Sequence, residues 1–177
     1  DDLQKLVKLS DPQFSPDGKS VAIVASTPVW KTDKHDTRID VVDVASGAKR
    51  TMTHDREDVS SPRWSPDGTR LAFLAKDDKT KHSQIYVMPL AGGEAQSITD
   101  SKEGINEFTW SPDGEHIAFI TQDAPVNEKA IKSHDKAFQV TDGNFLLREA
   151  LAPWHLWVVA SIGGTATRLT QGDYSLQ

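Results

Sequence analysis

The stretch Phe14-Ser15-Pro16-Asp17-Gly18 decides the fold, because it recurs in the same order twice more along the chain. The other copies are Trp64-Ser65-Pro66-Asp67-Gly68 and Trp110-Ser111-Pro112-Asp113-Gly114. The three serines are 50 and 46 residues apart. A repeat of this length is typical of proteins built from stacked copies of one supersecondary unit.

The residues of this repeat predict a tight turn between two strands. Proline presets φ for the second position of a type I turn, aspartate suits the third, and glycine supplies a left-handed residue at the fourth. A type I turn followed by a left-handed residue is a common hairpin connection. An apolar run follows each copy, at 21–24, 71–74 and 117–120. We therefore predict that the aromatic segment and the apolar run pair as antiparallel strands.

A second block, also present three times, predicts two further strands in each unit. It begins at Ile39, Ile85 and Leu156, continues to a glycine-containing turn, and ends at a threonine, Thr53, Thr99 or Thr170. The apolar runs are hydrophobic on both faces, which is typical of strands buried on both sides. Each unit is thus predicted to be a four-stranded antiparallel meander.

Three such meanders predict an all-β protein made of β-propeller blades. The repeat units cover about 11–53, 61–99 and 107–170, and residues 1–177 form one partial propeller. Propellers close with about four to eight blades, so three blades cannot complete a ring. We expect a fragment of a larger propeller, with seven blades as the expected number.

The third unit carries an insertion at about 122–153. Asn127 could cap a helix that runs to about Phe138, and 145–147 could form a short strand. A second short helix is plausible at 3–8. The charged residues of the insertion include Glu128, Arg148 and Glu149.

Composition excludes several classes of function. The chain has a net charge of -6 and no Lys/Arg-rich run, so we expect no binding to nucleic acid. Its longest apolar runs are too short for a transmembrane helix, and we expect no membrane span. It has no cysteine, which excludes disulfides, thiolate catalysis and Cys-ligated zinc.

No group of residues predicts a metal or cofactor site. The six histidines, His35, His54, His82, His116, His134 and His155, lack the spacing of a zinc motif, and we expect them on exposed loops and at strand ends. The clusters Asp33, His35, Asp36 and His54, Asp55, Glu57, Asp58 are expected to be solvated. Phe14, Trp64 and Trp110 could stack on a ligand, but we expect them to pack between blades.

The repeat resembles two groups of propellers. One is the periplasmic TolB type, and the other is the N-terminal propeller of the prolyl oligopeptidase family, in its acylaminoacyl-peptidase and dipeptidyl-peptidase branch. The opening Ser10-Asp11-Pro12 before the first turn, the segment His155-Leu156-Trp157 with Arg168-Leu169-Thr170, and the long insertion are more similar to the peptidases. Because such peptidases use propeller insertions to hold the substrate's N-terminus or to form contacts between subunits, the resemblance makes Glu128, Arg148 and Glu149 candidates for these contacts. A surface excursion without a ligand role is the alternative.

The resemblance implies a non-catalytic role for this chain. In that family the catalytic triad lies in a C-terminal α/β-hydrolase domain, with the nucleophile in a Gly-x-Ser-x-Gly elbow. This motif does not occur in the 177 residues, so no catalytic residue is assigned, the chain alone is expected to be inactive, and the substrate-binding residues stay unknown. The chain would gate the access of oligopeptides to a hydrolase domain outside it; a TolB-type scaffold for protein–protein interaction, without enzyme activity, is the alternative.

The same resemblance implies the partners and the location. The expected partners are a peptide substrate, the remaining blades and the hydrolase domain. Apart from the resemblance, the bare apolar faces of the outer units predict self-association of the isolated chain. A periplasmic or secreted location is expected, with the cytoplasm as the alternative. No cofactor is expected.

Overall fold

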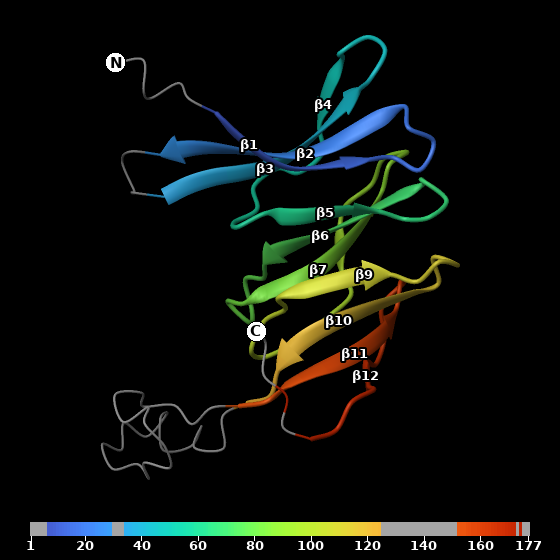
Figure 1. Ribbon diagram of the computed structural model, residues 1–177. Helices are drawn as coiled ribbons and strands as arrows, with labels where there is room; N and C mark the ends of the chain where they lie inside the picture. Colours follow the sequence, from blue (N-terminus) through green and yellow to red (C-terminus); the bar gives the residue numbers. More distant parts are fainter. Residues whose placement is uncertain (1–6, 30–33, 125–151, 173, 175–177) are drawn as a thin grey trace.

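The computed structural model describes residues 7–29, 34–124, 152–172 and 174, and within them every regular element is a β-strand (Figure 1). The strands form three four-stranded antiparallel sheets, with the orders β1-β2-β3-β4, β5-β6-β7-β8 and β9-β10-β11-β12. We call these sheets the first, second and third blades. The prediction of an all-β partial propeller made of three four-stranded meanders is therefore confirmed.

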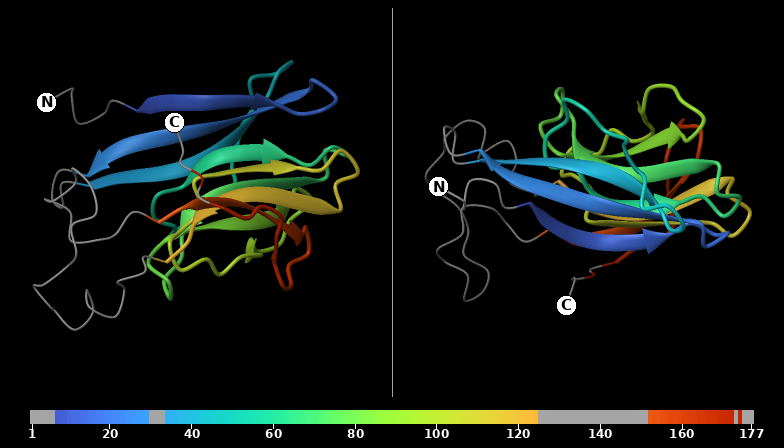
Figure 2. Two further views of the ribbon diagram at one scale, coloured as in Figure 1. Left: turned by 60° about the horizontal axis from the view of Figure 1, so that its bottom comes forward. Right: turned by 90° about the horizontal axis from the view of Figure 1, so that it is seen from above.

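The first blade has the longest strands, since β2 and β3 each span 10 residues and their counterparts in the other blades span 7. The strands are β1 Lys8–Phe14, β2 Ser20–Val29, β3 Lys34–Asp43, β4 Lys49–Thr51, β5 Ser60–Trp64, β6 Arg70–Lys76, β7 Ser83–Pro89, β8 Gln96–Ser97, β9 Glu107–Trp110, β10 His116–Gln122, β11 Trp154–Ala160 and β12 Thr167–Arg168. Figure 2 shows the same succession of blades from two further sides.

The Ser-Pro-Asp-Gly segments form the predicted hairpin turns. The three glycines have φ of 71°, 69° and 72°, the left-handed conformation that the turn requires, and each glycine amide donates to the carbonyl of the serine three residues before it. In the first turn the Ser15 hydroxyl donates to Asp17 (2.7 Å) and accepts from the amide of Ser20 (2.9 Å), and the other two turns repeat both bonds. The local chemistry of four residues thus fixes the connection between the first two strands.

The closing threonines have a common structural role. Thr53, Thr99 and Thr170 each accept a hydrogen bond through Oγ1 from the amide that begins the apolar part of the third strand, at 2.9, 3.0 and 3.0 Å. Each bond joins the end of the fourth strand to the third strand at a point where the ladder between them has ended. The recurrence of threonine therefore has a backbone reason.

The core lies between the blades. One cluster joins the first and second blades, and it includes Val24, Ile39, Phe73 and Tyr86; we call this contact the first seam. A second cluster, with Leu74, Ile85, Ile117 and Phe119, joins the second and third blades at the second seam. Phe73 and Leu74 are neighbours on β6 and point to opposite seams, as the period of two in a strand requires. The prediction that apolar runs are buried on both faces is fulfilled completely only in the second blade.

Two local features differ from the sequence predictions. Lys8 begins β1, so no helix extends to it; the rest of the helix predicted at 3–8, apart from Val7, lies outside the described residues. The predicted helix at 127–138 and strand at 145–147 also lie outside them. In addition, β1 and β5 each contain a bulge, at which Asp11 and Ser61 adopt left-handed φ of 50° and 52°.

Candidate functional site

The first strands of the three blades lie side by side, and indole groups join them (Figure 1). Trp64 of β5 donates its Nε1–H to the carbonyl of Gln13 in β1 (2.8 Å), and Trp110 of β9 donates to the carbonyl of Arg63 in β5 (3.1 Å). Both rings also pack against the seam clusters. The prediction that these tryptophans pack between blades is confirmed.

Phe14, at the corresponding position of the first blade, behaves differently. Its side chain is 68% exposed, because it lies on the face of the first blade that no described blade covers. A phenylalanine also has no N–H to donate, so the first blade presents a plain apolar ring at this position.

A salt bridge reinforces the contact between the first two strands. Arg63 donates through Nη1 to both carboxylate oxygens of Asp11, at 3.2 and 3.0 Å. Asp11 occupies the bulge of β1, so the bulge aims its side chain at the next blade. The role of these two residues was not predictable from the sequence, because the bulge depends on the register between β1 and β2.

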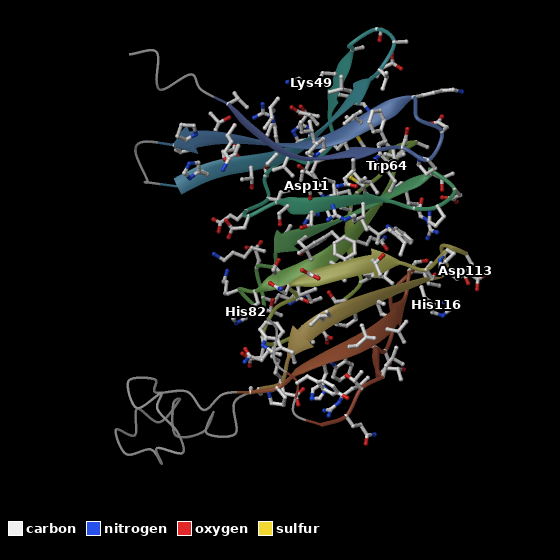
Figure 3. All side chains as sticks on the ribbon, in the orientation of Figure 1. Asp11, Lys49, Trp64, His82, Asp113 and His116 are labelled. Carbon is white, nitrogen blue, oxygen red and sulfur yellow. The ribbon has the colours of Figure 1, made fainter. Side chains whose placement is uncertain are left out.

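The turns of successive blades stack at one end of the molecule. A Cβ added to Gly68 would lie 3.5 Å from Pro16 of the preceding turn, and one added to Gly114 would lie 3.4 Å from Pro66. This end carries Asp113 and His116, whereas His82 marks the opposite end (Figure 3). We call the two ends the turn end and the loop end.

A cavity opens in the first seam at the turn end. Its volume is about 240 Å3, and we call it the turn-end cavity. Ten residues line it: Ser15, Pro16, Asp17, Ser20, Val41, Arg50, Trp64, Asp67, Gly68 and Leu90. The hydrogen bond from Ser65 lowers the pKa of Asp67 to about 2, and that from Ser15 lowers the pKa of Asp17. Both carboxylates at the cavity are therefore charged at neutral pH.

A second cavity, of about 370 Å3, lies at the loop end, where the start of β3 meets the connection between β4 and β5. We call it the loop-end cavity; Asp36, Thr37, Arg38, Thr53, His54, Asp55, Arg56 and Glu57 line it. Arg56 lies over the ring of Tyr86, with its guanidinium carbon 4.3 Å from the ring centre. Burial, and the hydrogen bond that Tyr86 donates to Asp77 (3.0 Å), raise the pKa of Tyr86. The wall of this cavity carries both positive and negative charges.

His155 corrects the expectation of exposed histidines. It is only 1% exposed, its Nδ1 lies 3.2 Å from the hydroxyl of Thr170, and its Nε2 lies 3.4 Å from Asp123. Tyr174 packs edge-on against its ring, at 5.9 Å between centres. These contacts cover the His155 side chain at the edge of the third blade. The residues that contact it come from separate segments of the chain, so the sequence pattern could not indicate its burial.

The two acidic clusters predicted from the sequence meet at the loop-end cavity, where Asp36 of one cluster and His54, Asp55 and Glu57 of the other line the wall. His35, Asp36, His54, Asp55, Glu57 and Asp58 are exposed, as predicted for solvated clusters; Asp33, Glu128, His134, Arg148 and Glu149 lie outside the described residues. Among the described residues, Asp113, Glu115 and His116 bring their ligand atoms within 4.8 Å of one another, but all three are exposed. The expectation that the chain holds no metal stays a prediction.

The blade architecture has a counterpart among known protein families. The family model "TolB beta propeller domain" matches residues 5–171. The chain belongs to the TolB beta propeller domain family.

Members of peptidase families are among the similar proteins. An uncharacterized peptidase, YuxL of Bacillus subtilis, is 38% identical over 87 residues, which are 49% of this chain and 13% of the relative. The acylaminoacyl peptidase of Pyrococcus horikoshii matches 95% of the chain with a TM-score of 0.72 and 22% identity, and a putative TolB of Agrobacterium tumefaciens matches 94% with a TM-score of 0.61 and 20% identity.

The chain spans only part of the length of the structures it matches. It covers 25% of the acylaminoacyl peptidase and 50% of the putative TolB. At these identities the structural likeness concerns the fold. The chain is a propeller domain related to peptidase propeller domains. Its described residues contain no helix with the length and apolarity needed to cross a membrane.

Proposed function

We propose that this chain is the non-catalytic propeller portion of a serine peptidase and that it limits the access of oligopeptides to an α/β-hydrolase domain outside the chain. The observation that supports this most directly is the row of first strands. β1, β5 and β9 are joined blade to blade by Trp64 and Trp110, and in a propeller the blades surround a central channel.

The contacts between blades are suited to hold a channel at one width, which would select substrates by size. Apolar clusters fill both seams, and hydrogen bonds and the Asp11–Arg63 salt bridge cross between first strands. Close-packed interfaces resist deformation, so the channel keeps a fixed width. An extended oligopeptide could pass along such a channel, whereas a folded protein could not.

The test uses the full-length protein and substrates of increasing length. We expect kcat/KM to fall steeply between a short peptide and a much longer peptide that carry the same scissile amide bond, because the longer chain no longer passes as one extended strand. Equal rates for short and long peptides would refute gating while leaving the peptidase intact. Failure to hydrolyse any of them would refute the peptidase assignment itself, and the 177-residue chain alone serves as the inactive control.

The outer faces of the first and third blades support two further proposals. Leu9 and Phe14 on the first blade and Leu169 on the third are 60%, 68% and 55% exposed. In a closed propeller each blade face packs against a neighbouring blade, so we propose that further blades cover these faces and that the isolated chain self-associates. Light scattering tests this: a monomer at high concentration would contradict it.

The unit boundaries at 11–53, 61–99 and 107–170, and a role for the 122–153 insertion, stay proposals. So does a periplasmic or secreted location, which the TolB family match supports, with the cytoplasm as the alternative. Cell fractionation with an antibody against the chain would decide between the compartments.

A binding scaffold without enzyme activity is the second candidate. The family description and the likeness to the putative TolB favour it. In that case the loop-end cavity would contact a partner protein. Its wall carries charges of both signs, from Arg38 and Arg56 and from Asp55 and Glu57. A full-length protein that hydrolyses no ester or peptide, but retains a protein partner in pull-down until Arg56→Glu is introduced, would support the scaffold and exclude the peptidase.

A further inference from the structure

One position in the repeat differs between blades in a way that creates a cavity. The first residue of the second strand is Ser20, Arg70 and His116 in the three blades. Arg70 reaches across the second seam: its guanidinium carbon lies 4.9 Å from the centre of the Trp110 ring, Nη2 donates to the carbonyl of Gly114 (2.8 Å), and Nη1 donates to Ser161 (2.9 Å). A guanidinium thus fills this space in the second seam.

The first seam has the same frame without the arginine. The counterparts of Trp110, Gly114 and Ser161 are Trp64, Gly68 and Leu90, and all three line the turn-end cavity together with Ser20. A serine is too short to reach across. In the part of the chain that the structure describes, the carbonyl of Gly68 accepts no hydrogen bond, whereas that of Gly114 accepts two.

We infer that the turn-end cavity binds the guanidinium group of a ligand. The face of Trp64 would stack on the planar cation, and the carbonyl of Gly68 would accept one of its N–H groups. Asp17 and Asp67 line the same cavity and add two negative charges. The site is independent of the proposed peptidase function, because it follows from the comparison of two seams.

Arg50 and Leu90 limit the strength of this site. Arg50 lines the cavity and donates through Nη2 to the carbonyl of Leu90 (3.1 Å). Its positive charge offsets part of the negative charge of the two carboxylates and so weakens their attraction for a cationic ligand. The side chain of Leu90 replaces the hydroxyl of Ser161, so a ligand keeps only one of the two neutral acceptors that Arg70 uses. The expected ligand is therefore a weakly bound group, either an arginine side chain of a peptide or a free alkylguanidinium.

A planar cation fits this frame better than a compact one. Guanidinium stacks on an aromatic face and directs its N–H groups within its own plane, whereas an ammonium is a strongly hydrated point charge. We expect ethylammonium to bind about fivefold more weakly than ethylguanidinium, the equivalent of about one net hydrogen bond.

The test compares ligand binding before and after a substitution that fills the turn-end cavity with an arginine side chain of the protein itself. Saturation-transfer difference NMR on the full-length protein would measure the binding of ethylguanidinium and of a short peptide with one central arginine. Ser20→Arg supplies the missing guanidinium, and we expect it to abolish the binding of both probes and to raise the melting temperature. His116→Arg is the matched control, since it places arginine at the same repeat position without a described Trp in front of it.

The outcomes separate the possibilities. Loss of binding in S20R but not in H116R supports the site, and a tighter fit of the peptide than of ethylguanidinium identifies peptides as the ligand source. Equal affinity for both probes identifies a free guanidinium compound. Binding that is unchanged in S20R, or absent from the wild-type protein, overturns the inference.

Discussion

The second blade and the two outer blades use the same repeat but bury it to different extents. All five central residues of β6, 71–75, are buried, whereas β2 and β10 alternate in part between buried and half-buried positions. The turns and closing threonines are the same in all three. Local hydrogen bonds therefore form each blade by itself, but only a neighbour on each side completes its apolar burial.

The largest expected effect on stability comes from removing a large side chain from the core of the second blade, which has a neighbouring blade on each side. Phe73 is 0% exposed and stacks on Tyr86 at 5.8 Å between ring centres. We expect Phe73→Ala to lower the free energy of unfolding by about 3–5 kcal/mol, the usual cost of such a cavity. Denaturant unfolding of the 177-residue chain measures this, with every variant at the same protein concentration because association changes the apparent stability.

An exposed apolar residue provides the control for that variant. Ile162 is 86% exposed in the turn before β12, so Ile162→Ala should change stability by less than about 0.5 kcal/mol. Phe14→Ala should be similarly mild in this chain, because Phe14 is bare. A large loss for Phe14→Ala in the full-length protein would show that a further blade covers it there.

A second prediction concerns a feature that does not depend on neighbours. Thr53 is buried, and its hydroxyl accepts from the amide of Ile39. Thr53→Val keeps the shape but leaves that amide unpaired, which should cost about 1–3 kcal/mol. The equivalent Thr170→Val in the third blade should cost more, because the Thr170 hydroxyl also lies 3.2 Å from Nδ1 of the buried His155, so two polar groups lose their partner. Equal losses in the two variants, measured by denaturant unfolding, would contradict this explanation.

The sequence allowed the blades to be predicted but not the contacts between segments distant in the chain. The Ser-Pro-Asp-Gly turns were predictable because proline, aspartate and glycine act within four residues. The bulge at Asp11 was not, because it depends on the register between two strands, and the burial of His155 depends on Asp123 and Tyr174. The difference between Ser20 and Arg70 was visible in the aligned repeats, but its meaning required the position of Trp110 across the seam.

A third prediction compares the indole groups of the seams. Trp110→Phe removes the hydrogen bond to Arg63 and part of the ring that faces the Arg70 guanidinium, so it should cost at least about 0.5–1.5 kcal/mol, the net value of one such bond. Trp157 is the matched control: its buried Nε1 has no hydrogen-bond partner among the described residues. Trp157→Phe should be neutral or stabilising, since it removes an unpaired buried N–H. A greater loss of unfolding free energy for Trp157→Phe than for Trp110→Phe would contradict this reading.

The smallest expected effect is on acid stability, and it arises in a turn that all blades share. The hydrogen bond from Ser65 lowers the pKa of Asp67 from 3.8 to about 2. A carboxylate with a lowered pKa stabilises the fold fully above its unfolded pKa, and this contribution disappears as the pH falls through the folded pKa. Stability should therefore decrease between about pH 4 and pH 2.

Two variants test this prediction. Asp67→Asn removes the titrating group and Ser65→Ala removes the main cause of the shift, so both should flatten the dependence of the urea midpoint on pH in this window. Because Asp67 lies at the surface, water screens much of its interaction and the difference should be small. Identical slopes in the wild type and Asp67→Asn would show that the turn carboxylate does not contribute to acid unfolding.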